Sequence, residues 1–273
     1  MKLQHYLDRI HYQASLQPTV ETLRQLHRAH LLAIPYENLD IHLGRRLTLD
    51  SGHIYHKIVE QRRGGWCYEM NGLFAWVLRE LGFDVTMLGS SVGAPARGGV
   101  DGDLDHLILL VQFEEPWLAD VGFGNGLLEP IPLCEGTYQQ GGFLFRLEQQ
   151  GDTWFLHNHA QGGPGIGFTL LNREYAGFAP RCHELQTSPE SGFVKSTVCH
   201  RYIPDSSGSN AIVSLRGAVL KHYRAEGTSE EEIETLARYQ EVFQTIFDLD
   251  GALADQLWEG VQKRHVEWKQ LQG

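Results

Sequence analysis

Apolar residues in the first third of the chain recur at intervals of three and four, which is the spacing of an amphipathic helix. Residues 3–12 and 19–32 each carry such a stripe. The same spacing begins again at Trp66 and ends at Gly82, after a Gly-Gly pair at 64–65. This pattern predicts three helices, of which the third has one well-buried face and follows a tight turn.

Beyond Gly82 the pattern changes to short runs of β-branched and aromatic residues, separated by Gly, Pro and Asp. A loop is expected over 93–105 from its composition, and a hairpin turn at residues 150–152, Gln-Gly-Asp. The short runs predict strands over 85–92, 106–113, 117–121, 142–148, 153–158, 166–171, 193–202 and 211–215. We expect these strands to form a small antiparallel barrel or sandwich.

Helical features return at the C-terminal end. Ser229 and Glu232 fit a capping box, which predicts a helix from there to about Phe247, and 251–270 predicts another. The chain has 273 residues, a length at which a single hydrophobic core usually gives way to several. We therefore expect more than one domain.

The charge balance excludes one class of partner. Lys and Arg total 23 against 34 Asp and Glu, a formal net charge of -11, which is the wrong sign for a protein that binds nucleic-acid phosphates. The first residues include charged side chains, and no uncharged apolar run approaches the roughly 18 residues of a membrane-spanning helix. The sequence predicts a soluble, cytoplasmic protein with no nucleic-acid or membrane partner.

Four widely spaced cysteines, without an export signal, are expected to be free thiols: Cys67, Cys134, Cys182 and Cys199. Only a thiolate attacks a substrate, and its pKa falls at a helix N-terminus or beside a histidine. Cys67 alone stands at a predicted helix start, after glycines that leave its sulfur accessible. Cys67 is the candidate nucleophile; the alternative is a small buried apolar residue.

A nucleophilic cysteine needs a base and a group that orients the base. His106 opens the apolar run DHLILLV, and Asp120 interrupts WLADVGFG, where a buried carboxylate requires a partner. If these runs pair as a hairpin through residues 114–116, His106 and Asp120 lie together at its open end. An imidazolium there would hold the pKa of Cys67 well below its ordinary value of about 8.5. The alternatives are a surface histidine and an aspartate taken up by a turn.

Three motifs in this order resemble the arylamine N-acetyltransferase family, in its bacterial type: RRGGWCYEMNGLF (62–74), DHLILLV (105–111) and WLADVGFG (117–124). IPYENL (34–39) and SPESGF (188–193) are similar to further motifs of that family. The resemblance covers about residues 5 to 205 with clear motifs and is weaker beyond.

The resemblance implies an α+β, multidomain fold with a cysteine-protease-like Cys-His-Asp core. Residues 1–84 would form a helical bundle with the catalytic cysteine, and 85–195 an antiparallel β-barrel with the histidine and aspartate. Residues 196–273 would form an α/β lid with C-terminal helices.

The resemblance also implies a chemistry. Cys67 would accept an acetyl group from acetyl-CoA, with His106 as its proton partner and Asp120 as the orienting carboxylate. The acetyl group would then pass to an aromatic amine, a hydrazine or an N-hydroxyarylamine by a ping-pong mechanism. No metal is expected.

Further residues correspond to family positions around the site. Tyr36, Phe123 and Phe193 match aromatic residues of the acceptor pocket, although Tyr36 replaces the usual phenylalanine. Asp105, Gly122 and Gly124 match positions near the cofactor, and Asp105 stands where small hydroxyl residues are common. A structural role is expected for Glu69 and Asn71, and a charge cluster under the site for Arg9, Glu37 and Arg63.

Two other functions remain open from the sequence. A Cys-His-Asp amide hydrolase or a transglutaminase-like acyl transferase would use the same nucleophile with water or a lysine as acceptor. A metal-binding module would use Cys182, His183, Cys199 and His200, but these adjacent pairs lack the usual ligand spacing.

Overall fold

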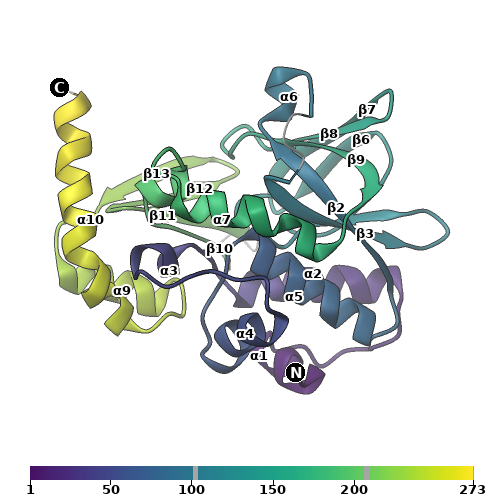
Figure 1. The fold of residues 1–273 in the computed structure, drawn as a ribbon, viewed down its shortest axis with the longest axis horizontal. Coiled ribbons are helices and arrows are strands. Elements are labelled where there is room, and N and C mark those ends of the chain that lie inside the picture. Colours follow the sequence, from purple (N-terminus) through teal and green to yellow (C-terminus); the bar gives the residue numbers. More distant parts are fainter. Residues whose placement is uncertain (101–103, 206–209, 273) are drawn as a thin grey trace.

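The computed structural model describes residues 1–100, 104–205 and 210–272 (Figure 1). Helices of the N-terminal part lie beside an eight-stranded antiparallel sheet, and a second sheet of five strands carries the two C-terminal helices (Figure 1). The α+β arrangement expected from the sequence is confirmed.

The three helices predicted near the N-terminus are present as α1 (Leu3–Arg9), α2 (Val20–Ala33) and α5 (Cys67–Glu80). Thr19 caps α2 by accepting the Thr22 N–H at 3.2 Å. Three shorter helices were not predicted, because they have too few residues to show the repeat of apolar positions. They are α3 (Leu39–His42), α4 (Ser51–Tyr55) and the π-helical η1 (His56–Glu60). Helix α5 is central, in contact with α1, α4 and the eight-stranded sheet.

The eight-stranded sheet curls into a nearly closed barrel, with strand order β5-β4-β3-β2-β9-β8-β7-β6. Its buried positions alternate along β7, where Phe143, Phe145 and Leu147 face the interior. Gly151, at a φ of +61°, makes the predicted turn between β7 and β8. The strands are β2 (Asp84–Val92), β3 (His106–Gln112), β4 (Trp117–Ala119), β5 (Ile131–Pro132), β6 (Gly136–Gln140), β7 (Phe143–Gln150), β8 (Thr153–His157) and β9 (Ile166–Asn172).

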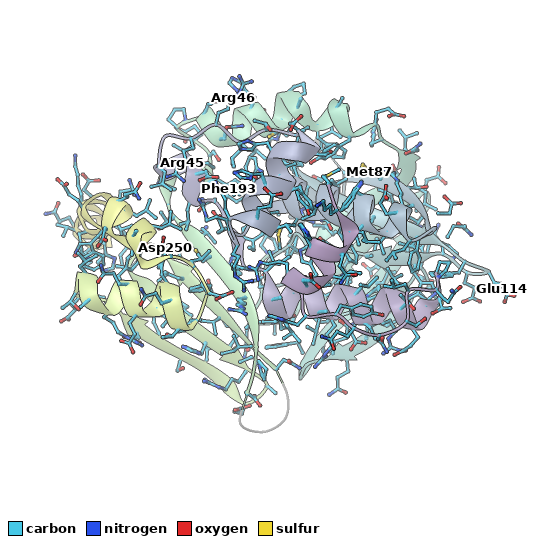
Figure 2. All side chains as sticks on the ribbon, turned by 90° about the horizontal axis from the view of Figure 1, so that it is seen from below. Arg45, Arg46, Met87, Glu114, Phe193 and Asp250 are labelled. Atoms are coloured by element: carbon cyan, nitrogen blue, oxygen red, sulfur yellow. The ribbon has the colours of Figure 1, made fainter. Side chains whose placement is uncertain are left out.

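The predicted hairpin of β3 and β4 is present. Leu109 pairs with Ala119 and Val111 pairs with Trp117, and Glu114 marks the protruding tip of the hairpin (Figure 2). This register brings the residues before β3 and after β4 to the same open end.

The second sheet runs in the order β1-β10-β11-β12-β13 and draws its first strand from the N-terminal part of the chain. Its strands are β1 (Tyr36–Glu37), β10 (Val198–Pro204), β11 (Asn210–Arg216), β12 (Val219–Arg224) and β13 (Gly227–Glu232). One face packs on α9 (Leu236–Thr245) and α10 (Gly251–Gln272) through a separate apolar core. The opposite face is left for the site.

Two sequence predictions need correction here, and two elements were not predicted. The strand expected over 193–202 starts only at Val198, because Ser191 caps the short helix α8 (Gly192–Lys195) by accepting the Phe193 N–H at 3.2 Å. The loop expected over 93–105 contains the short helix α6 (Ala94–Arg97), and its residues 101–103 lie outside the described part. A 3₁₀ turn η2 (Tyr175–Phe178) and the helix α7 (Ala179–Thr187) were not predicted.

The capping box expected at Ser229 and Glu232 is also wrong. Both residues lie in β13, where Ser229 pairs with His222 of β12. The helix begins later, and Thr235 caps it by accepting the Arg238 N–H at 3.3 Å. A serine and a glutamate three residues apart fit a capping box, but the same pair also occurs within a strand, so this spacing alone does not predict a helix start.

Candidate active site

Cys67 is the first residue of α5, and its side chain is 3% exposed. The chain enters this helix through Gly64, where a Cβ would lie 2.0 Å from the Pro35 carbonyl oxygen. No larger residue fits there unless the backbone moves. The Glu37 N–H donates to the Gly65 carbonyl at 2.9 Å, which ties the turn to β1. The two glycines therefore fix the start of α5 against the five-stranded sheet.

Five buried charged side chains support this turn: Glu37, Asp40, Lys57, Arg63 and Glu69. Lys57 Nζ lies 2.9 Å from Glu69 Oε2 and 2.9 Å from Asp40 Oδ2. Arg63 Nη2 lies 2.8 Å from Glu37 Oε1 and 3.0 Å from Asp40 Oδ1. Glu69 also accepts the Trp66 N–H at 3.2 Å, at the first turn of α5. Every charge in the cluster is paired, as buried charges require, and the cluster holds the helix N-terminus in place.

Arg9 does not belong to this cluster, contrary to the sequence prediction. Its guanidinium donates to the carbonyls of Ala33 at 3.0 Å and Ile58 at 3.3 Å, and it lies 3.6 Å from Asp248. Burial lowers the pKa of Arg9 to about 10. Lys57 takes the place in the cluster that was predicted for Arg9.

His106 and Asp120 meet at the open end of the β3–β4 hairpin. His106 Nε2 lies 2.7 Å from Asp120 Oδ2, and each residue is 3% exposed. The other carboxylate oxygen accepts the Asn71 side-chain N–H at 2.8 Å and the Gly122 N–H at 2.9 Å. Burial would raise the pKa of Asp120, but His106 and these hydrogen bonds lower it below its ordinary value. Asp120 is therefore an ionised carboxylate under the imidazole.

Asn71 joins the helix of the thiol to the strands of the imidazole and the carboxylate. Its Nδ2 donates to the Leu107 carbonyl at 2.6 Å as well as to Asp120, and its Oδ1 accepts the Val121 N–H at 3.0 Å. It lies one helical turn after Cys67, on the same face of α5. The structural role expected of Asn71 is therefore to hold α5 against the segments that carry His106 and Asp120.

The thiol of Cys67 lies in an environment with opposing effects. Burial raises its pKa well above the ordinary value, and the charge of Asp120 adds to the rise, while the N–H groups of Leu107 and Tyr68 oppose it. The raised pKa is contrary to the sequence prediction, which placed the pKa of Cys67 well below its ordinary value. A thiolate here requires a positive charge close to the sulfur.

A cavity of about 600 Å³ opens onto both Cys67 and His106. Most of the other residues singled out in the sequence line it: Tyr36, Asp105, Gly122, Phe123 and Phe193. The Phe123 ring packs edge-on against His106 with ring centroids 5.2 Å apart, and Phe193 packs likewise on Trp66 at 5.5 Å. Three parts of the chain that are distant in sequence thus form one aromatic-lined site.

Comparison with known proteins shows to which family the chain belongs. A model of the N-acetyltransferase family matches residues 19–255. The chain is 35% identical over 261 residues to the arylamine N-acetyltransferase, pineal gland isozyme NAT-3, of Gallus gallus, with 87% of this chain and 89% of that protein covered. It is 34% identical to the arylamine N-acetyltransferase of Escherichia coli K12, with 90% and 88% covered. The chain belongs to the arylamine N-acetyltransferase family.

Solved structures of this family share the fold. The arylamine N-acetyltransferase of Mycobacterium marinum superimposes with a TM-score of 0.86 at 32% identity, covering 96% of this chain and 99% of that one. The same enzyme in complex with CoA gives a TM-score of 0.86 at 31% identity, with the same coverage. The arylamine N-acetyltransferase fold expected from the sequence motifs is confirmed.

The two glycines of the VGFG motif have different surroundings in this chain. A Cβ on Gly122 would lie 2.8 Å from Cys67 Cα, so this glycine lets the segment after β4 approach the nucleophile. Its N–H is already donated to Asp120. Gly124, at a φ of +82°, packs against the His200 ring, and a Cβ there would lie 2.7 Å from His200 Cδ2. Gly124 is not among the residues that line the cavity.

Asp105 is paired at the candidate site. The Arg181 guanidinium of α7 donates to its Oδ1 at 2.7 Å. This ion pair neutralises the negative charge that stands beside His106 in the sequence. Arg181 also lines the cavity and was not predicted, because nothing in a local sequence pattern connects residues 76 positions apart.

The metal-binding alternative finds no site in the described residues. No three of their His, Cys, Asp or Glu side chains gather closely enough to hold a metal ion. Cys182 lies on α7 and Cys199 on β10, and they belong to separate apolar cores. Among the helices of the described chain, none has the length and apolar character needed to cross a membrane.

Proposed function

We propose that this protein transfers the acetyl group of acetyl-CoA to an arylamine, an arylhydrazine or an N-hydroxyarylamine by a ping-pong mechanism through an acetyl-cysteine at Cys67. The observation that carries the proposal is the 2.7 Å contact of His106 with Asp120 at the wall of the cavity that also contains Cys67. Membership of the family and the CoA complex of the Mycobacterium marinum relative support the choice of donor.

In the first half of the reaction, His106 takes the proton of the Cys67 thiol and becomes an imidazolium. The carboxylate of Asp120 stabilises that charge and presents Nδ1 to the cavity, because Nε2 is bound to Oδ2. The sulfur attacks the thioester carbonyl carbon, the bond from that carbon to the CoA sulfur breaks, and the departing thiolate takes the proton from His106. One thioester replaces another of similar energy, so the acetyl group is stored without a large change in free energy.

In the second half, the nitrogen of the acceptor attacks the acetyl-cysteine. His106 takes a proton from that nitrogen and returns it to the Cys67 sulfur as the C–S bond breaks. An aromatic amine is neutral near pH 7 and arrives as a nucleophile, whereas an alkyl amine such as lysine arrives protonated. We propose Tyr36, Phe123 and Phe193 as the aromatic walls that hold its ring.

Intact mass measurement tests the proposal directly. The protein mixed with acetyl-CoA should gain one acetyl group, and a later addition of an aromatic amine should remove it and yield the N-acetyl product. Cys67→Ala should gain none, while Cys182→Ala, which removes a buried thiol outside the mechanism, should gain it normally.

Two outcomes would contradict the proposal. Acetylation that persists in Cys67→Ala would place the nucleophile elsewhere. An acetyl group lost to water as fast with the amine as without it would favour the hydrolase alternative.

A further inference from the structure

The backbone of Asp120 leaves the eight-stranded sheet just where its carboxylate meets His106. The pairing of β3 with β4 ends at Leu109 and Ala119, so among the described residues no strand partner accepts the Asp120 N–H. This N–H donates instead to Nε2 of His27 at 3.1 Å. Because a buried N–H needs an acceptor, the imidazole of His27 takes the place of the missing strand partner.

His27 lies on α2 and is completely buried. Its Nδ1 lies 3.0 Å from the Leu128 carbonyl oxygen. Since Nε2 accepts the Asp120 N–H, the hydrogen of the neutral ring is on Nδ1, which donates it to that carbonyl. The ring also packs edge-on against Phe74 of α5, with centroids 5.8 Å apart. Two backbone partners therefore fix the tautomer of His27, and α5 fixes the place of its ring.

One imidazole thus holds both ends of the segment 120–128. Residues between those ends line the cavity that contains Cys67: Gly122, Phe123 and Asn125. The contact at Leu128 fixes the point where this segment rejoins the rest of the barrel, and the contact at Asp120 fixes the point from which the carboxylate extends. Helix α2 therefore supports one wall of the cavity, although the residues that line that cavity come from other elements.

The contact with Asp120 requires a neutral ring. A protonated imidazole carries hydrogen on both nitrogens, so its Nε2 would face the Asp120 N–H as a second donor. Burial lowers the pKa of His27 to about 4, although the negative charges of Asp120 and Glu129 nearby favour the protonated form. His27 therefore accepts the Asp120 N–H throughout the neutral pH range.

We propose that His27 is a positioning residue: it fixes the backbone of Asp120, and through the carboxylate it fixes the orientation of His106. The carboxylate oxygens are held by Asn71, the Gly122 N–H and His106. Those contacts set the rotation of the side chain, whereas the contact with His27 sets the position of the main chain that carries it. The effect expected on acetylation rests on the function proposed above, and the effect expected on the thiol does not.

Two substitutions at His27 separate its two hydrogen bonds. Glutamine places its amide atoms as many bonds from Cα as Nε2 of histidine, and asparagine places them as many bonds from Cα as Nδ1. His27→Gln can therefore still accept the Asp120 N–H, whereas His27→Asn can serve only the Leu128 carbonyl. Each variant loses one of two buried hydrogen bonds, so both should lower the midpoint of thermal unfolding by a few degrees.

The maximal rate of Cys67 acetylation by acetyl-CoA is measured for both variants at pH 7. His27→Asn should lower this rate about tenfold and change the half-saturating concentration of acetyl-CoA less than about twofold, because a displaced carboxylate affects the chemical step and not the binding of the donor. His27→Gln should recover at least about half of the wild-type rate. Equal losses of rate in two variants that unfold at the same temperature would overturn the proposal, since the rate would then follow stability alone.

Alkylation of Cys67 by iodoacetamide needs no acyl donor, so it separates this inference from the proposed function. In His27→Asn the pH midpoint of alkylation should rise, because a carboxylate that is no longer held against His106 stabilises the imidazolium less. The same substitution in an Asp120→Asn background should cause no further rise, since its effect passes through that carboxylate. These results would support the positioning role even if acetyl-CoA does not acetylate the wild type. A full additional rise in the Asp120→Asn background would overturn it.

His30→Asn is the matched control. His30 is the next buried imidazole on α2, and its hydrogen bonds go to the Tyr6 hydroxyl at 2.8 Å and to the Met70 sulfur at 3.5 Å. Its substitution should lower the midpoint of thermal unfolding and leave the alkylation midpoint of Cys67 unchanged. An alkylation midpoint that rises as much as in His27→Asn would overturn the proposal, because any loss of a buried imidazole from α2 would then have the same effect.

A measurement on the wild type applies even if His27→Asn does not fold. A long-range ¹H–¹⁵N spectrum at pH 7 should show the ring of His27 as neutral, with its hydrogen on Nδ1. This result supports the proposal, because only that form accepts the Asp120 N–H and donates to the Leu128 carbonyl. A ring with hydrogen on Nε2 would overturn it.

Discussion

Replacement of Asp120 by asparagine tests how the proton is placed on His106. Oδ1 of Asp120 accepts two hydrogen bonds, from Asn71 at 2.8 Å and from the Gly122 N–H at 2.9 Å. In Asp120→Asn the amide oxygen must take that position, because an NH₂ group there would face two donors. The amide NH₂ then points at His106 Nε2, which can only accept. The proton of the imidazole is forced onto Nδ1, the nitrogen that should receive the proton of Cys67.

The expected loss of acetylation rate reflects two changes in Asp120→Asn: the imidazole takes the wrong tautomer, and the negative charge that stabilises the imidazolium is removed. The equivalent change in a Ser-His-Asp triad reduces kcat about 10⁴-fold, which is about 5.5 kcal/mol in the activation free energy. We expect a loss of this order in the rate of Cys67 acetylation, measured by rapid quench and intact mass. The hydrogen bonds of Asn71 and Gly122 are retained, so the midpoint of thermal unfolding should shift by only a few degrees.

The pH dependence of alkylation by iodoacetamide gives a second readout. Burial and the charge of Asp120 raise the pKa of Cys67, so removal of that charge alone would lower the midpoint. Loss of the imidazolium acts in the opposite direction, and it should dominate because the 2.7 Å contact of Asp120 with His106 is a direct charge-assisted hydrogen bond. We therefore expect the midpoint to rise in Asp120→Asn.

Asp152→Asn, at the exposed β7–β8 turn, is the matched control and should leave both the rate and the midpoint unchanged. A folded Asp120→Asn protein that keeps a tenth or more of the wild-type acetylation rate would refute the reasoning. An alkylation midpoint that falls would show that Asp120 acts on the sulfur and not through His106.

Three further predictions concern the framework of the site. Lys57→Met should destabilise the fold by about 3–5 kcal/mol in urea unfolding, because it leaves buried carboxylates without their cation; an effect below 1 kcal/mol would show that the cluster is hydrated. Gly64→Ala, with a Cβ 2.0 Å from a carbonyl oxygen, should lose soluble, active protein, whereas Gly177→Ala, with nothing within 4 Å, should behave as wild type. Burial lowers the pKa of His27 to about 4, so the unfolded chain binds a proton there first as pH falls below about 6.5, and stability is lost between pH 6.5 and 4. His27→Gln should reduce the loss of unfolding free energy from pH 7 to pH 5 by about 2 kcal/mol, and an unchanged loss would contradict the burial of a neutral imidazole.

Local sequence patterns predicted those parts of the site that are formed by residues close together in the chain. The Gly-Gly turn, the start of α5 at Cys67 and the pairing of β3 with β4 each leave a mark within about fifteen residues. The hairpin then brings His106 and Asp120 together without further information. The roles assigned to these residues remain predictions.

Contacts between side chains that are far apart in the sequence could not be predicted from local patterns. No role was predicted for Lys57 or Asp40, yet both are buried in the cluster under α5. Arg181 comes from a helix that the pattern missed, and it reaches Asp105 because α7 packs beside the cavity, which Arg181 and Leu185 line. Such pairs follow from tertiary packing, which decides the partner of a charged residue independently of its sequence neighbours.

The net charge of the chain does not predict where its cations lie in the fold. A charge of -11 argues against a general affinity for polyanions. The fold, however, distributes its cations unevenly: Lys57 and Arg63 are paired with buried carboxylates, while Arg216 and Arg264 have no ion pair with any residue that the structure describes. Screening limits the reach of the distant acidic surface to about 8–10 Å in physiological salt. A local group of cations can therefore act on a nearby anion although the total charge of the protein is negative.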